Sequence, residues 1–244
     1  MVGARTAGMA WNRILDLPFD RLNPRTADWP ASQGRVTRPA LMVLAVIATA
    51  LFLYSASRLN ALCFQLSPIA IAALTFYPFL KRFTWLCHWG LGLVLGIAPV
   101  GGWLAVTGQW DLRVLWLAAA VTLWVAGFDI LYATLDLDFD RRHRLYSVPQ
   151  RVGIIPALRV ARLCHAGMVL CMGGFGLATQ RAGIYWLGWA SVAALLHYEH
   201  RLVTPTDLRR VNQAFFVVNG WVSACLLVTT VMDIAYRWPL PFWR

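Results

Sequence analysis

Acidic residues are scarce in this sequence, and most of them fall in two clusters. The chain holds ten Asp and one Glu in 244 residues, and seven of the Asp lie at positions 16, 20, 28, 129, 136, 138 and 140. Asp16 and Asp20 are four residues apart, as are Asp136 and Asp140, so on a helix each pair occupies one face. Stacked carboxylates repel one another unless a cation neutralises them. Mg²⁺ binds one or two carboxylates together with phosphate oxygens, so the pattern predicts Mg²⁺ and a diphosphate between the two pairs.

The same spacing extends each face by one turn. Asn12 precedes Asp16 by four residues, and Tyr132 precedes Asp136 by four. Asp129 lies about two turns deeper, where an ionisable side chain is a candidate for function, with pairing to another buried polar group as the alternative. For the clusters as a whole, the alternative is solvated helix ends paired with neighbouring Arg. We expect Asp138 to face away from its neighbours and to pair with Arg141 or Arg142.

Three further residues have the chemistry to bind phosphate or a substrate ring beside the carboxylates. Lys81 is the only Lys among 22 basic residues, and it follows Tyr77 by four. A compact ammonium aimed at a phosphate oxygen accounts for this exception in an Arg-rich chain, with chance as the alternative. Arg25 lies in the segment after the first cluster, where a guanidinium provides a second diphosphate ligand.

Long uncharged segments define the elements that carry these residues. They cover 39–57, 59–80, 83–110, 114–128, 163–180, 182–198 and 211–232. A membrane-spanning helix needs about 20 apolar residues. The sequence therefore predicts an all-α polytopic bundle in one domain, 1–244, with seven full spans. Residues 1–12 are predicted to form the second half of a helix, so that either this segment lies on the membrane or upstream residues are missing.

Basic residues are distributed unevenly among the connecting segments. Sixteen fall in the alternate set of connectors that includes both acidic clusters, five fall in the other set, and Arg5 belongs to neither. The positive-inside rule therefore places both clusters in the cytoplasm and the C-terminus outside. Because these Arg lie in short loops, nucleic acid is not an expected partner. Pro18 is expected to kink or end the first helix, leaving Asp20 on the following loop. Glu199 and His200 are expected to cap a helix or pair with a loop.

Three motifs resemble those of the UbiA superfamily of intramembrane aromatic prenyltransferases. They are NRILDLPFDRLNPRT (12–26), YPFLKRFTW (77–85) and GFDILYATLDLDFD (127–140). The segments SVPQRVG (147–153) and YEHRLVTPTDLRRVNQAFFVVNG (198–220) are similar to the bacterial 4-hydroxybenzoate polyprenyltransferase branch. The resemblance covers nearly the whole chain. It implies a nine-span fold around a cavity that faces the cytoplasm of the inner membrane, with the first span and half of the second missing here.

The resemblance also implies the activity and a role for each motif residue. The activity is Mg²⁺-dependent transfer of a polyprenyl group from its diphosphate to an aromatic ring. The implied metal ligands are Asp16, Asp20, Asp136 and Asp140. The implied substrate-binding residues are Asn12, Arg25, Tyr77, Lys81 and Tyr132. We expect Asp136 and Lys81 to be catalytic through the leaving group, and Asp129 to take up a proton or orient the acceptor. In place of a second Arg that family members usually carry, this chain has Trp29.

Several alternatives for the function stay open at the level of sequence. The acceptor is expected to be 4-hydroxybenzoate in quinone biosynthesis, or another aromatic acceptor in a menaquinone route. From a different class, the chain is an ion-coupled membrane transporter that uses Asp129. A third alternative is an inactive truncation product. Membrane lipid is an expected partner, and the sequence gives no sign of an obligate protein partner.

Overall fold

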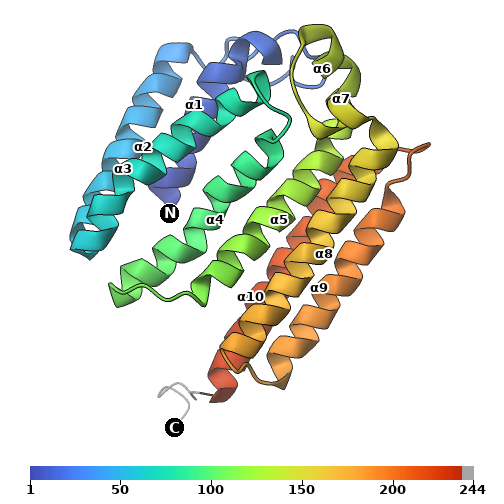
Figure 1. The fold of residues 1–244 in the computed structure, drawn as a ribbon. Helices are drawn as coiled ribbons and strands as arrows, with labels where there is room; N and C mark the ends of the chain where they lie inside the picture. Colours follow the sequence, from blue (N-terminus) through green and yellow to red (C-terminus); the bar gives the residue numbers. More distant parts are fainter. Residues whose placement is uncertain (238–244) are drawn as a thin grey trace.

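A computed structural model describes residues 1–237 of the chain; this part consists of helices joined by turns and loops, and its only β-structure is an isolated bridge between Thr204 and Asp207. Figure 1 shows the elements. The α-helices are α1 (Val2–Asp20), α2 (Arg38–Leu59), α3 (Ala61–Phe76), α4 (Cys87–Thr107), α5 (Val114–Ala133), α6 (Leu137–His143), α7 (Val148–Val152), α8 (Ile154–Ala178), α9 (Gly183–Leu202) and α10 (Asn219–Arg237). Two 3₁₀ turns, η1 (Tyr77–Arg82) and η2 (Thr134–Asp136), and a π-helical segment, η3 (Gln213–Val218), complete the order.

Six of these helical segments are long and apolar enough to cross a membrane. They are Arg38–Leu59, Ala61–Arg82, Cys87–Thr107, Val114–His143, Ile154–Ala178 and Gln213–Tyr236. The predicted count of seven is not confirmed, because α9 is not among them. Its 20 residues are long enough, but several Trp, Tyr and His, together with Glu199 and Arg201, lower its mean hydropathy. The all-α, multi-pass character of the chain is confirmed.

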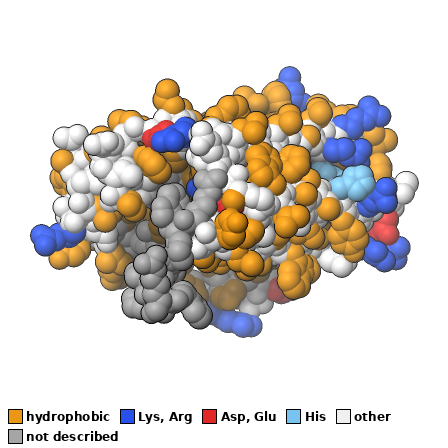
Figure 2. Space-filling view, turned by 90° about the horizontal axis from the view of Figure 1, so that it is seen from below, with side chains coloured by type: hydrophobic (Ala, Val, Ile, Leu, Met, Phe, Trp, Pro, Cys, Tyr) orange, Lys and Arg blue, Asp and Glu red, His pale blue; other side chains and the backbone are white. Residues whose placement is uncertain are grey.

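Exposed apolar side chains cover the outside of the bundle. On α8, Leu163, Leu170 and Leu177 lie seven residues apart, and each is more than 70% exposed. In water such a face would be costly, whereas lipid tails are a suitable solvent for it. Figure 2 shows the bundle from its lower end in Figure 1, where apolar side chains also predominate and basic side chains lie mostly near the rim. We therefore expect the exposed apolar side chains along the spanning helices to contact lipid.

Small residues bring the central helices close together. A side chain at Gly92 or Gly96 of α4 would collide with backbone atoms of α5, because an added Cβ would lie 2.3 Å from the Thr122 carbonyl oxygen or 2.8 Å from that of Ala118. Gly127 of α5 packs in the same way against His165 of α8. Close packing of backbones through small residues is typical of membrane helices. The short distance between α4 and α5 determines which side chains contact one another at the ends of the two helices.

One end of the bundle gathers most of the polar structure. The C-termini of α1 and α5, the N-termini of α4 and α8, the short helices α6 and α7 and the segment that follows α1 all lie there (Figure 1). The basic connectors predicted to share one side of the membrane lie at this end. The last seven residues of the predicted domain, including Arg244 of the C-terminus, lie outside the described residues.

Two predictions about local helix geometry are wrong: that α1 ends at Pro18 with Asp20 on the following loop, and that the second acidic cluster lies on one continuous helix face. Helix α1 continues through Pro18 and ends at Asp20. Pro18 lies in the last turn, where the Arg21 N–H still donates to the Leu17 carbonyl (3.2 Å) and the Leu15 carbonyl accepts from Arg82 (2.7 Å), so few helical hydrogen bonds are lost. The second acidic cluster, in contrast, does not share one continuous helix face, because the 3₁₀ turn η2 separates α5 from α6.

A buried polar network lies between α8, α9 and the start of α10. Glu199 is fully buried and accepts a hydrogen bond from Asn219 (3.2 Å), and its other oxygen lies 3.4 Å from His165. His165 also contacts His200 at 3.0 Å. Asn219 also donates to the carbonyl of Phe215 in the π-helical segment η3 (3.0 Å). The expectation that Glu199 and His200 cap a helix or pair with a loop is therefore wrong, because the close approach of three helices buries them together.

Candidate active site

A cavity of about 290 Å³ opens at the polar end of the bundle. Eight of the residues predicted for the site line it: Asn12, Asp16, Asp20, Arg25, Tyr77, Lys81, Asp129 and Tyr132. These residues come from α1, the following loop, η1 and α5, which are far apart in the sequence. Asp136 and Asp140 do not line the cavity and lie behind Arg25 and Lys81. The structure thus gathers most of the predicted site around one space.

The first acidic cluster forms one wall through consecutive turns of α1. Asp16 accepts a hydrogen bond from Asn12 (2.9 Å), as their spacing predicts, and lies 3.8 Å from Arg82. Asp20 pairs with Arg13 at 2.8 Å. Burial, followed by repulsion from Asp20, raises the pKa of Asp16 to about 6, although Arg82, Lys81 and Asn12 act in the opposite direction. Asp16 therefore carries a charge that is incompletely compensated in the ligand-free protein.

The second cluster is held by residues of the loop after α1. Arg25 donates to both oxygens of Asp136, from Nε (2.9 Å) and from Nη2 (2.6 Å), and its Nη1 donates to the Tyr132 hydroxyl (2.9 Å). Asn23 donates to Asp136 as well (2.8 Å). Burial lowers the pKa of the Arg25 guanidinium, but the hydrogen bonds and charge of Asp136 outweigh it, so that the pKa is raised. This bidentate pair joins the loop to the end of α5.

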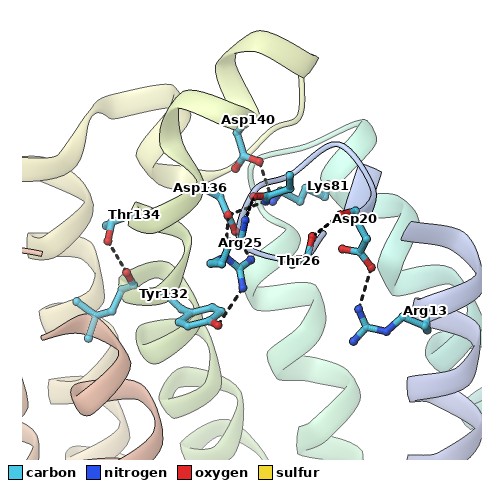
Figure 3. A network of polar contacts seen from close by, with 11 residues as sticks. Arg13, Asp20, Arg25, Thr26, Lys81, Tyr132, Thr134, Asp136 and Asp140 are labelled. Carbon is cyan, nitrogen blue, oxygen red and sulfur yellow. Dashed lines mark hydrogen bonds and ion pairs between the residues drawn. The ribbon is translucent and has the colours of Figure 1, made fainter. Parts of the chain in front are cut away.

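Lys81 and Asp140 form the innermost ion pair. The Lys81 Nζ lies 2.8 Å from one oxygen of Asp140, and the Asp140 side chain is fully buried. Apart from this ion pair, neither Asp140 oxygen accepts a hydrogen bond from the described residues. The predicted lone-Lys position is therefore an electrostatic partner for the second cluster. Figure 3 shows Asp136 and Asp140 on one side and Asp20 on the other, with Lys81 between them and Arg25 beneath Asp136.

Asp129 lies in the cavity wall and is paired with a histidine. Its Oδ2 is 2.6 Å from Nδ1 of His88, the second residue of α4, and its side chain is 28% exposed. The sequence left open whether Asp129 pairs with another buried polar group, and it does. His88 was not predicted. Only the packing of α4 on α5 brings the two together, so no spacing in the sequence could indicate the pair.

Aromatic side chains form another part of the wall. Tyr132 stacks on Phe215 of η3, with ring centroids 4.2 Å apart. Trp29 lies in the cavity with the Arg13 guanidinium 3.9 Å from its ring centroid and that of Arg25 at 5.8 Å. Sequence reasoning did not find Arg13, Asn23 or Phe215. Asn23 could have been found from the sequence, because it lies two residues before Arg25 in the NPRT segment. Phe215 could not, because its position beside Tyr132 depends on the π-helical segment η3.

The positions of the possible metal-ligating side chains decide whether a metal ion fits in the cavity. Within residues 1–237, no group of three or more His, Cys, Asp or Glu side chains is close enough to hold a metal ion by itself. Mg²⁺ needs only one or two carboxylates when phosphate oxygens and water complete its shell. Asp16 and Asp20 on the cavity wall offer such a pair, and Asp140 has oxygens without hydrogen bonds. The donor set fits Mg²⁺ that arrives with a phosphate ligand.

Comparisons with known proteins agree on one family. The model of the UbiA prenyltransferase family matches residues 1–222. The chain is 32% identical to the 4-hydroxybenzoate octaprenyltransferase of Nitrosospira multiformis, over 96% of this chain and 80% of that protein. It is 33% identical to the enzyme of the same name from Ralstonia nicotianae, over 96% and 79%.

Solved structures agree with these relatives. The apo structure of a UbiA homolog from Aeropyrum pernix K1 superposes with a TM-score of 0.88 at 35% identity, covering 95% of this chain and 86% of that one. Digeranylgeranylglyceryl phosphate synthase shares the fold, with a TM-score of 0.70 at 18% identity, covering 95% of this chain and 81% of that one. The motifs, the cavity and these matches lead to one conclusion: this chain belongs to the UbiA prenyltransferase family.

Proposed function

We propose that this membrane enzyme transfers a polyprenyl group from its diphosphate to 4-hydroxybenzoate, with Mg²⁺ as its cofactor, in quinone biosynthesis. The observation that carries the proposal is a cavity lined by Asp16, Asp20, Arg25 and Lys81, in which Arg25 and Lys81 are ion-paired with Asp136 and Asp140 behind them. The names of the relatives from N. multiformis and R. nicotianae support the aromatic acceptor. Family membership favours an enzyme over the ion-coupled transporter that Asp129 alone would allow.

The ion pairs of the cavity suggest how a diphosphate is bound. In the ligand-free protein Arg25 neutralises Asp136, Lys81 neutralises Asp140 and Arg13 neutralises Asp20. We propose that these cations turn to phosphate oxygens when the substrate enters. Asn12 and Tyr77 border the same space as further polar contacts. Asp16 and Asp20 would hold Mg²⁺ together with phosphate oxygens, and Asp136 and Asp140 would join them once Arg25 and Lys81 turn to the substrate; the bound ion would supply positive charge for the leaving diphosphate.

The residues on each wall of the cavity have a role in the proposed reaction. The bond between the allylic carbon and the diphosphate oxygen breaks, and its electron pair leaves with the diphosphate, where Lys81 and Arg25 stabilise the charge. The allylic cation that remains lies near Tyr132, whose ring face attracts positive charge. The acceptor ring then forms the new carbon–carbon bond, and Asp129 either takes up the proton released by the acceptor or orients the acceptor for attack. Water must be excluded from the cation until the ring attacks.

The proposed orientation follows from charge. The basic connectors lie at the end of the bundle that carries the cavity (Figure 1). By the positive-inside rule this end faces the cytoplasm of the inner membrane, where a charged, water-soluble acceptor and Mg²⁺ are available. The polyprenyl chain stays among the apolar helices and membrane lipid.

A direct test uses membranes that contain this chain. They are supplied with a polyprenyl diphosphate, Mg²⁺ and labelled 4-hydroxybenzoate, and labelled lipid is measured. We expect product that disappears with EDTA and in Asp136→Asn, while membrane insertion of that variant stays normal. Product with an acceptor of a menaquinone route, and none with 4-hydroxybenzoate, would replace the acceptor. Full turnover in Asp136→Asn would overturn the metal assignment.

A further inference from the structure

His88 is buried at the start of α4 and has a hydrogen-bond partner on each ring nitrogen. The side chain is 3% exposed and lines the inner surface of the cavity beside Asp129. Its Nδ1 lies 2.6 Å from Asp129 Oδ2, and its Nε2 lies 3.2 Å from the backbone nitrogen of Val148. The role proposed above for Asp129 leaves this histidine without an assigned part.

The backbone contact fixes the protonation pattern of the ring. A backbone N–H can only donate, so the Nε2 that Val148 contacts must offer a lone pair. A neutral imidazole then carries its hydrogen on Nδ1, which points at the carboxylate of Asp129. The hydrogen bond is therefore directed from His88 to Asp129. Asp129 Oδ2 is occupied by this donor, whereas no described residue donates to Oδ1.

The surrounding packing holds the ring in this position. Gly92 and Gly96 follow His88 at steps of four on α4, and both are in close contact with the backbone of α5, which carries Asp129. On the other side, Val148 begins α7, and the residue before it, Ser147, caps that helix through a hydrogen bond to Gln150 (3.2 Å). The adjoining Tyr146 N–H donates to the Lys81 carbonyl (2.8 Å). His88 thus lies between the closely packed helices α4 and α5 on one side and, on the other, the segment 146–148, which is hydrogen-bonded to the Lys81 carbonyl.

We infer that His88 is a positioning residue, which holds one oxygen of Asp129 so that the other faces the acceptor. The inference rests on the proposed role of Asp129 in prenyl transfer. In that step the acceptor proton goes to Oδ1 as the new carbon–carbon bond forms and the diphosphate leaves with the electron pair of the broken carbon–oxygen bond. Because Nδ1 donates to Asp129 and Nε2 accepts from the Val148 N–H, His88 has no free ring nitrogen with which to take up the proton itself. A carboxylate free to rotate would present Oδ1 to the acceptor only part of the time.

Two substitutions separate the two sides of the ring. His88→Asn keeps an N–H donor at the place of Nδ1, towards Asp129, and loses the acceptor for Val148. His88→Gln keeps an acceptor at the place of Nε2, towards Val148, and loses the short donor to Asp129. His197→Gln, at an exposed histidine of α9, is the control for the substitution itself. A residue that only anchors α7 would tolerate Gln better than Asn, whereas a residue that positions Asp129 would tolerate Asn better than Gln.

The experiment measures steady-state kinetics with each substrate in turn. We expect His88→Gln to lower kcat/KM for the aromatic acceptor by about 10- to 100-fold, the range for loss of a hydrogen bond to a charged group. His88→Asn should recover most of that loss, and KM for the polyprenyl diphosphate should not change in either variant. In an Asp129→Asn background, His88→Gln should have no further effect. Equal losses in the two variants, or a larger loss in His88→Asn, would overturn the inference.

A spectroscopic measurement keeps this test separate from the proposed reaction. The infrared carboxylate bands of Asp129, identified by their absence in Asp129→Asn, should shift in His88→Gln and stay close to the wild-type position in His88→Asn. Unshifted bands in His88→Gln would overturn the inference whatever the enzyme does. Shifted bands in a protein that prenylates no aromatic acceptor would support the His88–Asp129 contact and refute the proposed function.

Discussion

The bidentate contact between Arg25 and Asp136 is expected to be the main tie between the loop after α1 and the end of α5. Arg25→Lys keeps the positive charge but can make only one of the two hydrogen bonds to Asp136, and it loses the bond to the Tyr132 hydroxyl. Each hydrogen bond to a charged group contributes about 1.5–3 kcal/mol, and Asp136 is only 8% exposed. We therefore expect the free energy of unfolding to fall by about 2 kcal/mol.

The assay is unfolding of the detergent-solubilised protein by SDS, in EDTA so that no metal binds. A double-mutant cycle of Arg25→Lys and Asp136→Asn should give a coupling of about 2 kcal/mol, because each single variant removes the same contact. Arg209 pairs with Asp207 at the surface, where it is 90% exposed, so Arg209→Lys should cause no measurable change. A coupling below about 0.5 kcal/mol would refute the view that this pair holds the loop in place.

Three further predictions address the cation, the pH dependence and the helix packing. Lys81→Arg should keep the charge yet reduce kcat roughly tenfold, since the larger guanidinium does not fit beside the fully buried Asp140. A wild-type kcat would show that any cationic side chain suffices at this position. Burial raises the pKa of Asp16 to about 6, so this side chain is ionised above that pH and neutral below it. The Mg²⁺ concentration for half-maximal activity should therefore rise between pH 7 and pH 5. An unchanged concentration would exclude Asp16 as a ligand. Gly92→Ala should lower both activity and stability, because the added Cβ would lie 2.3 Å from the Thr122 carbonyl oxygen. Gly101→Ala is the control, because open space surrounds that position, and it should lower neither. Similar losses in both variants would point to a general effect of the substitution.

The helical architecture could be predicted because it depends on features that lie along the chain. Long uncharged segments reveal spanning helices, and the i, i+4 spacing of Asn12, Asp16 and Asp20 reveals one face of α1. These expectations rest on helix geometry alone. For α9 the same reasoning is less certain, because Trp and Tyr suit the membrane interface but score as weakly apolar.

The contacts across the site could not be predicted to the same degree. His88 meets Asp129 only because Gly92 and Gly96 let α4 approach α5, and this distance is set by tertiary packing. Asp136 turns away from the face of Asp129 because η2 interrupts the helix, a change of geometry over three residues that no spacing indicates. Glu199 shows the same difficulty, since its partners His165 and Asn219 come from two other helices, α8 and α10.

The paired charges of the cavity have a consequence for how its ligands enter. A diphosphate that arrived alone would draw Arg25 or Lys81 away and leave Asp136 or Asp140 buried without a cation, at a cost of several kcal/mol. A metal ion that arrived alone would leave the basic side chains crowded against it. Ligands that arrive together let every charge exchange one partner for another. We therefore expect metal and diphosphate to bind cooperatively, each raising the affinity for the other by the same factor, so that the empty cavity discriminates against isolated ions of either sign.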